Sequence, residues 1–176
     1  MAEAPQFESV VTDEMRAQIG VPREPFVCEV TTTGVRMFAR AVGYTDPIYY
    51  DRAEARRRGL RDLPAPPGYL GTPIFDPESS DPTGGTRRGT QAGVRSPYTL
   101  VLNGGTDVEY TGVDICAGDE LTGVARLESL TERYSPALAG PMLVQVTATT
   151  YTNQQGEVVA TVRGTGLSYG PRRDDG

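Results

Sequence analysis

Apolar positions recur along the chain with two periods, one helical and one of strands. The stretch 26–32 alternates and is rich in β-branched residues, which predicts the first strand. Spacings of three and four over 34–42 predict a helix capped by Thr33. Its apolar stripe, which we expect to be buried, consists of Val35, Phe38, Ala39 and Val42. A second short helix is expected over 51–58, ending at Gly59.

The second half of the chain reads as strands. An ordered element begins at 98–102, 106–110 alternates, and 120–134 is a long strand whose imperfect alternation predicts a bulge near Gly123 or Ala125. A hairpin with its turn at 153–156 is the clearest structural prediction. Its two apolar stripes are Met142, Val144, Val146 and Ala148 on the outgoing strand, and Val158, Ala160 and Val162 on the return.

Three stretches lack such periodicity and set the domain limits. Residues 1–25 form an N-terminal extension with a short helix over 14–19 capped at Thr12, and 170–176 form a frayed tail. One domain therefore covers 26–169. The long loop 71–97 inside it is either functional or disordered. Its arginines could reach a phosphate or a partner, but a mobile, solvated loop is the simpler interpretation.

Charge and composition exclude several classes of function. The net charge of −6 argues against general nucleic-acid binding, which requires a basic surface. Cys28 and Cys116 lie far apart, without the spacing of a metal site, so no metal is expected, and the two cysteines are either free buried thiols, the simpler interpretation, or a cross-strand disulfide. No apolar run reaches the length of a membrane span and no secretory signal is evident, which predicts a cytoplasmic protein.

The stretch 41–51 joins the two predicted helices and places three tyrosines beside two acids. Asp46 precedes Pro47, so the first helix cannot continue past Gly43 and a rigid loop follows. Rigid loops with polar aromatic and carboxylate side chains are common sites of binding or catalysis. The stretch resembles the signature Gly-Asp-x-Asn-Pro-(Leu/Ile/Val)-His-x-Asp of MaoC-like hydratases, which are hot-dog proteins.

That resemblance keeps the frame of the signature and loses its catalytic pair. Gly43, Pro47, Ile48 and Asp51 match it, and Asp46 stands in place of Asn. Tyr44 and Tyr49 occupy the positions of the Asp and His that activate water in the family reaction. The chain contains no histidine at all, so no displaced imidazole can replace the missing one.

Further motifs are similar to the N-terminal, fatty-acid-synthase-like dehydratase branch of the same superfamily. They lie, in order, at 65–67, 102–105, 117–119, 140–142, 150–153 and 156–160. The resemblance implies an α+β hot-dog fold, an antiparallel sheet wrapped around a central helix, and pairing with a separate catalytic protomer. It also implies an acyl thioester of coenzyme A or a carrier protein as substrate, with no other cofactor. The implied substrate-binding residues are Tyr44, Asp46, Tyr49, Asp51, Pro66, Tyr69, Gly104 and Gly105.

Four arginines cluster at the C-terminal end of the second predicted helix, and this cluster has two interpretations. Arg56, Arg57, Arg58 and Arg61 complement the C-terminal end of the helix dipole, which is the simpler one. They could instead form a clamp for the phosphates of coenzyme A or a dock for an acidic carrier protein.

Three functions remain open at this point. The first is a noncatalytic, substrate-binding subunit of a heteromeric (R)-specific enoyl-CoA hydratase or 3-hydroxyacyl-thioester dehydratase. The second is a self-sufficient enzyme that uses Tyr44, Tyr49 and Asp46, with Asp51 as a further candidate, although a phenol is a poor general base at neutral pH. The third is a homodimer that binds an acyl thioester without chemistry.

Overall fold

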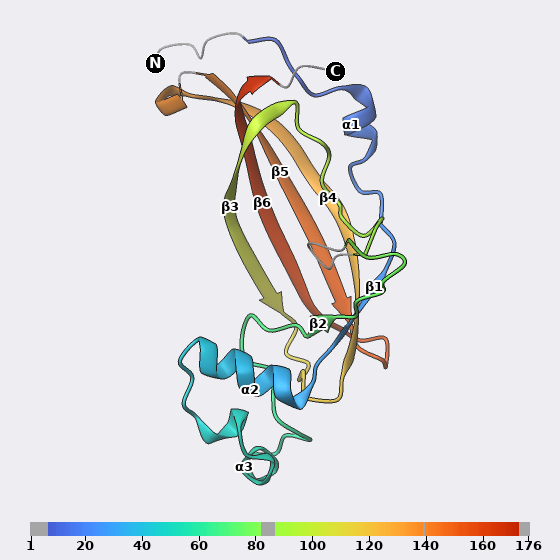
Figure 1. The fold of residues 1–176 in the computed structure, drawn as a ribbon, viewed down its shortest axis with the longest axis vertical. Coiled ribbons are helices and arrows are strands. Elements are labelled where there is room, and N and C mark those ends of the chain that lie inside the picture. The colour runs from blue at the N-terminus through green and yellow to red at the C-terminus, as the bar shows by residue number, and fades with distance from the viewer. Residues whose placement is uncertain (1–6, 82–86, 139, 173–176) are drawn as a thin grey trace.

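A computed structural model describes residues 7–81, 87–138 and 140–172. Its strands form a six-stranded antiparallel sheet in the order β2-β1-β4-β5-β6-β3 (Figure 1). The strands are β1 Phe26–Glu29, β2 Thr72–Pro73, β3 Tyr98–Tyr110, β4 Glu120–Ser135, β5 Gly140–Thr152 and β6 Val158–Arg172. The α+β class and the antiparallel sheet agree with the sequence-based prediction.

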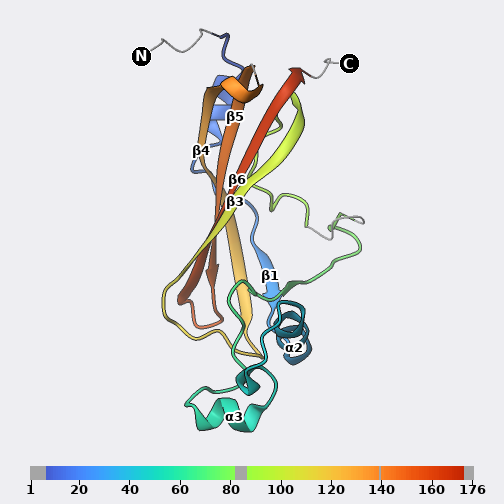
Figure 2. The ribbon, with the colours of Figure 1, turned by 90° about the vertical axis from the view of Figure 1, so that its left-hand side faces the viewer.

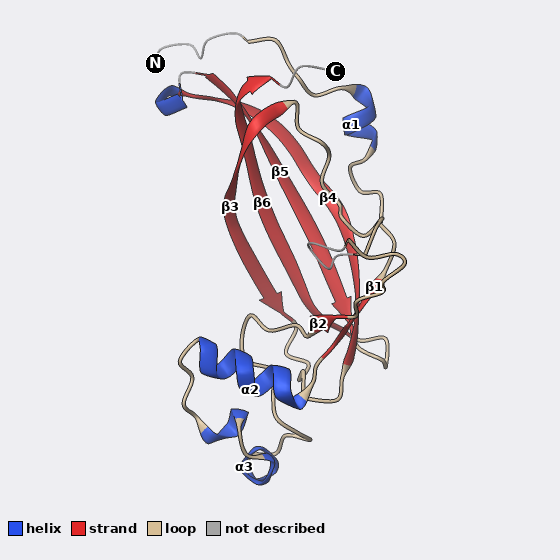
Figure 3. Cartoon of the chain, in the orientation of Figure 1, coloured by secondary structure: helices blue, strands red, loops and turns tan. Residues whose placement is uncertain are grey.

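The helices are short and lie at the ends of the sheet (Figure 3). They are α1 Asp13–Ala17, α2 Thr32–Ala41, η1 Pro47–Tyr49, α3 Arg52–Arg57 and η2 Pro136–Leu138. The start predicted for α2 was two residues late, because Thr31 rather than Thr33 accepts a hydrogen bond, from the backbone N–H of Gly34 at 3.0 Å. Glycine 43, with a φ of 80°, ends the helix as expected.

The long strands differ from prediction in two details. The segments 98–102 and 106–110 are one strand, β3, with a shift in register between Asn103 and Gly105. The bulge of β4 lies between Leu127 and Ser129, not near Gly123 or Ala125, because 121–127 alternate without interruption. The turn at 153–156 was predicted correctly, with the N–H of Gly156 donating to the carbonyl of Asn153 at 2.9 Å.

One face of the sheet, called the inner face here, is covered by helix and loops. Buried Leu121, Ala125 and Leu127 of β4 lie on it. Helix α2 covers one end of this face, where Val35 joins a buried cluster with Leu121. Figure 2 shows α2 and the segment around β2 on the same side of the sheet. Helix and loop therefore share the task of shielding the inner face.

The two apolar stripes of the hairpin turned out to lie on opposite faces. Thr149 pairs with Val162 and Tyr151 with Ala160, so these two residues of the return stripe share the inner face with the odd-numbered residues of β5. Val158, beyond a shift in register, pairs with Thr152 on the outer face. The outgoing stripe, which includes Ala148, therefore lies on the outer face. Alternation in the sequence shows that each strand has one apolar side, but only the register of the pairing determines which sides of neighbouring strands share a face of the sheet.

The N-terminal extension is part of the packed domain over 10–23. Val10, Val11 and Met15 pack against a second buried cluster on the far half of the sheet, made of Tyr98, Leu127, Leu130 and Leu143. Beyond β1, the segment 19–23 follows the edge of β4, with the N–H of Gly20 donating to the Leu127 carbonyl and that of Arg23 to the Ala125 carbonyl, both at 2.8 Å. This segment continues the edge that β1 covers only in part.

Two further segments were predicted as more loosely held than they are. In loop 71–97, the described residues Ser80, Thr90, Ala92 and Ser96 are buried, which contradicts a solvated loop. Residues 82–86 of that loop and 173–176 of the predicted tail are outside the described part of the chain. Strand β6 continues to Arg172, which pairs with Tyr98, so the tail begins later than predicted.

Candidate functional site

The signature loop 43–51 is held by its own carboxylates. The Asp46 carboxylate caps η1 by accepting from the N–H of Ile48 at 3.1 Å, and it pairs with Arg58 at 3.0 Å. The first of these hydrogen bonds, and then Arg58, lower the pKa of Asp46. Asp51 caps α3 by accepting from the N–H of Ala53 at 2.8 Å. Both acids thus serve the local backbone as helix caps.

Tyr44 and Tyr49 occupy the two catalytic positions of the hydratase signature and stack on one another. Their ring centroids lie 5.6 Å apart with an interplanar angle of 24°. Burial, and after it the charges of Tyr44 and Asp46, raise the pKa of Tyr49. A phenol whose pKa is raised holds its proton more firmly, so Tyr49 is suited to donate a hydrogen bond and unsuited to act as a base.

Three of the four arginines at the C-terminal end of α3 have partners within the chain. Arg57 and Arg58 both bind Glu54, at 2.5 and 2.6 Å, and Arg58 also binds Asp46. Arg61 binds the buried carboxylate of Asp119. Arg56 is exposed and has no ion pair among the described residues. The side-chain geometry therefore favours local neutralisation over a ready-made phosphate clamp.

The carboxylate of Asp119 lies at the centre of a buried polar cluster in the turn before β4. It accepts from the N–H of Cys116 at 2.8 Å and the amide of Gln154 at 2.9 Å, and it is paired with Arg61. Burial raises the pKa of this group, but these donors together outweigh burial and hold the pKa of Asp119 below its usual range. The cluster fixes the turn to the hairpin at 153–156 and is structural.

The remaining predicted binding residues are far apart in the fold. Pro66 and Tyr69 are buried against α2, where the Tyr69 ring lies 5.3 Å from that of Phe38. Gly104 and Gly105 lie in β3, at the opposite edge of the sheet from β2. The structure brings together only the signature-loop residues Tyr44, Asp46, Tyr49 and Asp51.

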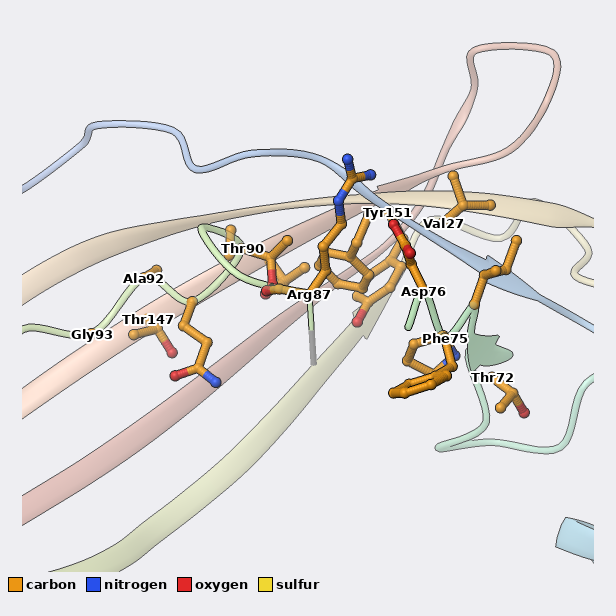
Figure 4. A pocket seen from close by; sticks show the side chains of 16 residues that line it. Val27, Thr72, Phe75, Asp76, Arg87, Thr90, Ala92, Gly93, Thr147 and Tyr151 are labelled. Carbon is orange, nitrogen blue, oxygen red and sulfur yellow. The ribbon is translucent and has the colours of Figure 1, made fainter. Parts of the chain in front are cut away.

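A cavity of about 860 Å³ lies over the middle of the inner face. This sheet cavity is lined by the segments 72–76 and 87–93 on one side and by β1, β4 and β5 on the other, and it is open to solvent in part (Figure 4). Its volume is in the range of about 300–1,000 Å³ typical of small-molecule sites. None of the predicted binding residues lines it.

The sequence carried weak signals for this cavity. Thr147, Thr149 and Tyr151 lie on one side of β5, and all three line the cavity. Nothing in the sequence around them distinguishes these residues from the other polar positions of the strand. Ile74 and Phe75 are an apolar pair inside a loop that is otherwise polar, and this pair was the better clue. Burial raises the pKa of Tyr151 to about 12, with a smaller contribution from the neighbouring Cys28. Its phenol therefore stays protonated and can donate.

The described residues contain neither a metal-binding cluster nor a disulfide. No three ligating side chains of His, Cys, Asp or Glu gather in a way that could hold a metal ion there. Cys28 and Cys116 are buried free thiols. In the same part of the chain, every helix falls short of the length and apolarity needed to cross a bilayer.

Comparison with known proteins places these observations in context. The family model for the FAS1-like dehydratase domain region matches residues 17–162. A relative from Thermomonospora curvata, described as a probable enoyl-CoA hydratase alpha subunit, is 29% identical over 150 residues. The match covers 80% of this chain and 45% of the relative, so the chain spans less than half of that protein's length.

Two solved structures share the fold. The ChsH1–ChsH2 complex from Mycobacterium tuberculosis aligns with a TM-score of 0.67 and 21% identity, over 90% of this chain and 93% of the other. The truncated HadBC complex of the same organism, a 3R-hydroxyacyl-ACP dehydratase, gives 0.59 and 19%, over 86% and 97%. These likenesses confirm the hot-dog fold that the sequence resemblance implied.

Proposed function

Because this chain belongs to the FAS1-like dehydratase family, we propose that it is the noncatalytic, substrate-binding subunit of a heteromeric (R)-specific enoyl-thioester hydratase or 3-hydroxyacyl-thioester dehydratase. The observation that carries the proposal is the pair of stacked tyrosines, Tyr44 and Tyr49, at the two catalytic positions of a signature frame that otherwise differs only in Asp46 for Asn. A second hot-dog chain with the Asp/His pair would supply the chemistry.

The chemistry explains why a companion is needed. Addition of water to an enoyl thioester requires a base that takes a proton from water and an acid that returns one to the substrate carbon. In this chain the raised pKa of Tyr49 removes the base, and Asp46 and Asp51 are occupied as helix caps. The sequence contains no histidine. The loop therefore lacks a group that could move the protons of a bound thioester.

The β3 edge supports a hot-dog partner. Strand β3 is 13 residues long, stands at the end of the sheet, and is exposed along most of its length. Its apolar side chains Val101 and Leu102 are 64% and 51% exposed. A long, exposed, partly apolar edge strand is a surface that proteins normally cover. The two solved neighbours are described as complexes, which supports a second chain without giving its position.

The substrate would be an acyl thioester of coenzyme A or of a carrier protein, and no other cofactor is needed. The two buried free thiols fit a reducing compartment, so we place the complex in the cytoplasm. A hetero-oligomer is favoured over a homodimer, because two copies of this chain would contribute four tyrosines and still no base.

Reconstitution tests the proposal. Hydration of an enoyl-CoA is measured as the loss of absorbance of its conjugated thioester. The purified chain alone should give no hydration above background, and adding a hot-dog subunit with the Asp/His pair should restore turnover. In the complex, the Tyr44→Phe/Tyr49→Phe double variant should keep its rate within about twofold, because neither phenol transfers a proton. Turnover by the isolated chain would refute the proposal and favour the self-sufficient enzyme.

Assembly is tested separately through the edge strand. Val101→Lys places a charge on the β3 edge and should prevent co-elution with the partner in size-exclusion chromatography. Val158→Lys is the matched control, because Val158 is also exposed, at 42%, but lies in β6, inside the sheet. Unimpaired assembly of the Val101 variant would show that the partner binds elsewhere.

A further inference from the structure

The sheet cavity is lined by apolar side chains at the end that faces β1 and β2. Phe26, Val27, Ile74, Phe75 and Tyr151 lie there, together with the polar side chains of Thr72, Asp76 and Arg87 (Figure 4). Towards the other end the lining becomes polar, with Thr147 and Thr90 beside the backbone of Ala92 and Gly93 (Figure 4). A cavity whose large apolar side chains gather at one end, with a few polar groups around them, suits a ligand with a hydrocarbon tail and a polar head.

A row of alternating large and small residues crosses the inner face below the cavity. Cross-strand pairing places these five residues side by side on neighbouring strands: Phe26, Gly123, Tyr151, Ala160 and Tyr110. On the far side of this aromatic row, Cys28 and Leu121 belong to the cluster that packs against α2. The row therefore separates the packed core under the helix from the open cavity.

Phe26 lies in this row because Gly123 has no side chain. A Cβ added to Gly123 would meet three atoms of the Phe26 ring at 2.5, 2.8 and 2.9 Å, which is closer than packed atoms approach. The ring thus lies flat over the glycine, and Tyr151 fixes it from the other side in an edge-to-face contact with centroids 6.0 Å apart. Any side chain at position 123 would push the ring off the sheet and towards the cavity.

We infer that the sheet cavity binds the aliphatic acyl group of the thioester, tail first, and that the Phe26 ring seated on Gly123 sets the length of chain it accepts. This inference rests on the proposed function for the thioester class and adds the location of its acyl group. It also assigns Phe26 a role in specificity that no signature-loop residue has. Removing the ring deepens the cavity, and displacing the ring shortens it.

The test measures binding of saturated acyl-coenzyme A thioesters from butanoyl to hexadecanoyl, which cannot be hydrated and so report binding alone. In Phe26→Ala, the preferred chain should become longer, with a gain of about three- to fourfold in affinity for each further buried methylene. In Gly123→Ala, the preferred chain should become shorter. Gly166→Ala is the matched control, because no atom lies within 4 Å of a Cβ added there, and its profile should equal that of the wild type.

The double variant Gly123→Ala/Phe26→Ala distinguishes a displaced ring from a damaged sheet. If the glycine acts through the ring, the double variant should show the long-chain preference of Phe26→Ala, whereas a damaged sheet would bind every thioester poorly. Wild-type binding with unshifted profiles in both single variants would overturn the inference and leave the reconstitution result intact. Shifted profiles without restored turnover would instead refute only the catalytic partnership. Absence of wild-type binding to every thioester would overturn both.

Discussion

Replacing Asp119 by alanine should destabilise the chain more than any other exchange of a single carboxylate described above. Its side chain is only 1% exposed and accepts hydrogen bonds from Cys116, Gln154 and Arg61. The substitution removes the carboxylate acceptor and leaves the buried N–H of Cys116 without a partner. An unpaired buried donor costs more free energy of folding than the loss of both partners would.

The size of the effect follows from Cys116 and Arg61, because the third donor, Gln154, is exposed and can be solvated. The N–H of Cys116 is left buried without an acceptor, at about 1–3 kcal/mol. Arg61 is 49% exposed and can be solvated, so its part is about 0–1 kcal/mol. We expect a total of about 3 kcal/mol, which lowers the melting temperature by about 6–12 °C for a chain of this size.

Thermal unfolding followed by circular dichroism measures this difference. Glu120→Ala is the control, because it removes the neighbouring acid, which is exposed and caps nothing in the turn, and it should change stability by less than about 0.5 kcal/mol. If Asp119→Ala melted with the wild type, or if both variants lost the same amount, the polar cluster would not be a source of stability.

Two other predictions concern charge. Because the donors hold the pKa of Asp119 low in the folded state, its contribution is complete above the unfolded value of about 4 and is lost as the pH falls through the folded pKa. The stability gap between wild type and Asp119→Ala, measured by urea unfolding, should therefore narrow in acid, and a gap independent of pH would contradict the assigned charge. Arg56→Glu/Arg57→Glu should leave thioester affinity within about twofold, since Arg57 already pairs with Glu54. A loss of thioester affinity above about tenfold, measured by isothermal titration calorimetry, would support the interpretation of these arginines as a phosphate clamp.

Sequence patterns determined most of the secondary structure because each element has a local cause. Gly43 and Pro47 ended one helix and set the signature loop, and the turn at 153–156 joined two strands. The start of α2 was predicted wrongly because two residues could cap the helix equally well. Thr31 and Thr33 are equally good caps in isolation, and only the packing of α2 on the sheet selects the first.

The cavity could not be predicted for a different reason. Phe26, Gly123 and Tyr151 are 97 and 28 residues apart along the chain, and they meet only through the register of three strands. Alternation does not specify register when both faces carry apolar residues, as the two stripes of the hairpin do. The signature loop was visible because its residues are contiguous, whereas the cavity is a product of pairing.

The two borders of the sheet differ in a way that limits how many chains can join. On the β4 side, the segment 19–23 and the short β1 and β2 occupy the hydrogen-bonding groups that a foreign strand would need. Among the described strands, only β3 offers a long edge without a neighbouring strand. Growth through strand addition can therefore happen once, which yields a closed pair of chains and leaves no second growing end from which a fibre could extend.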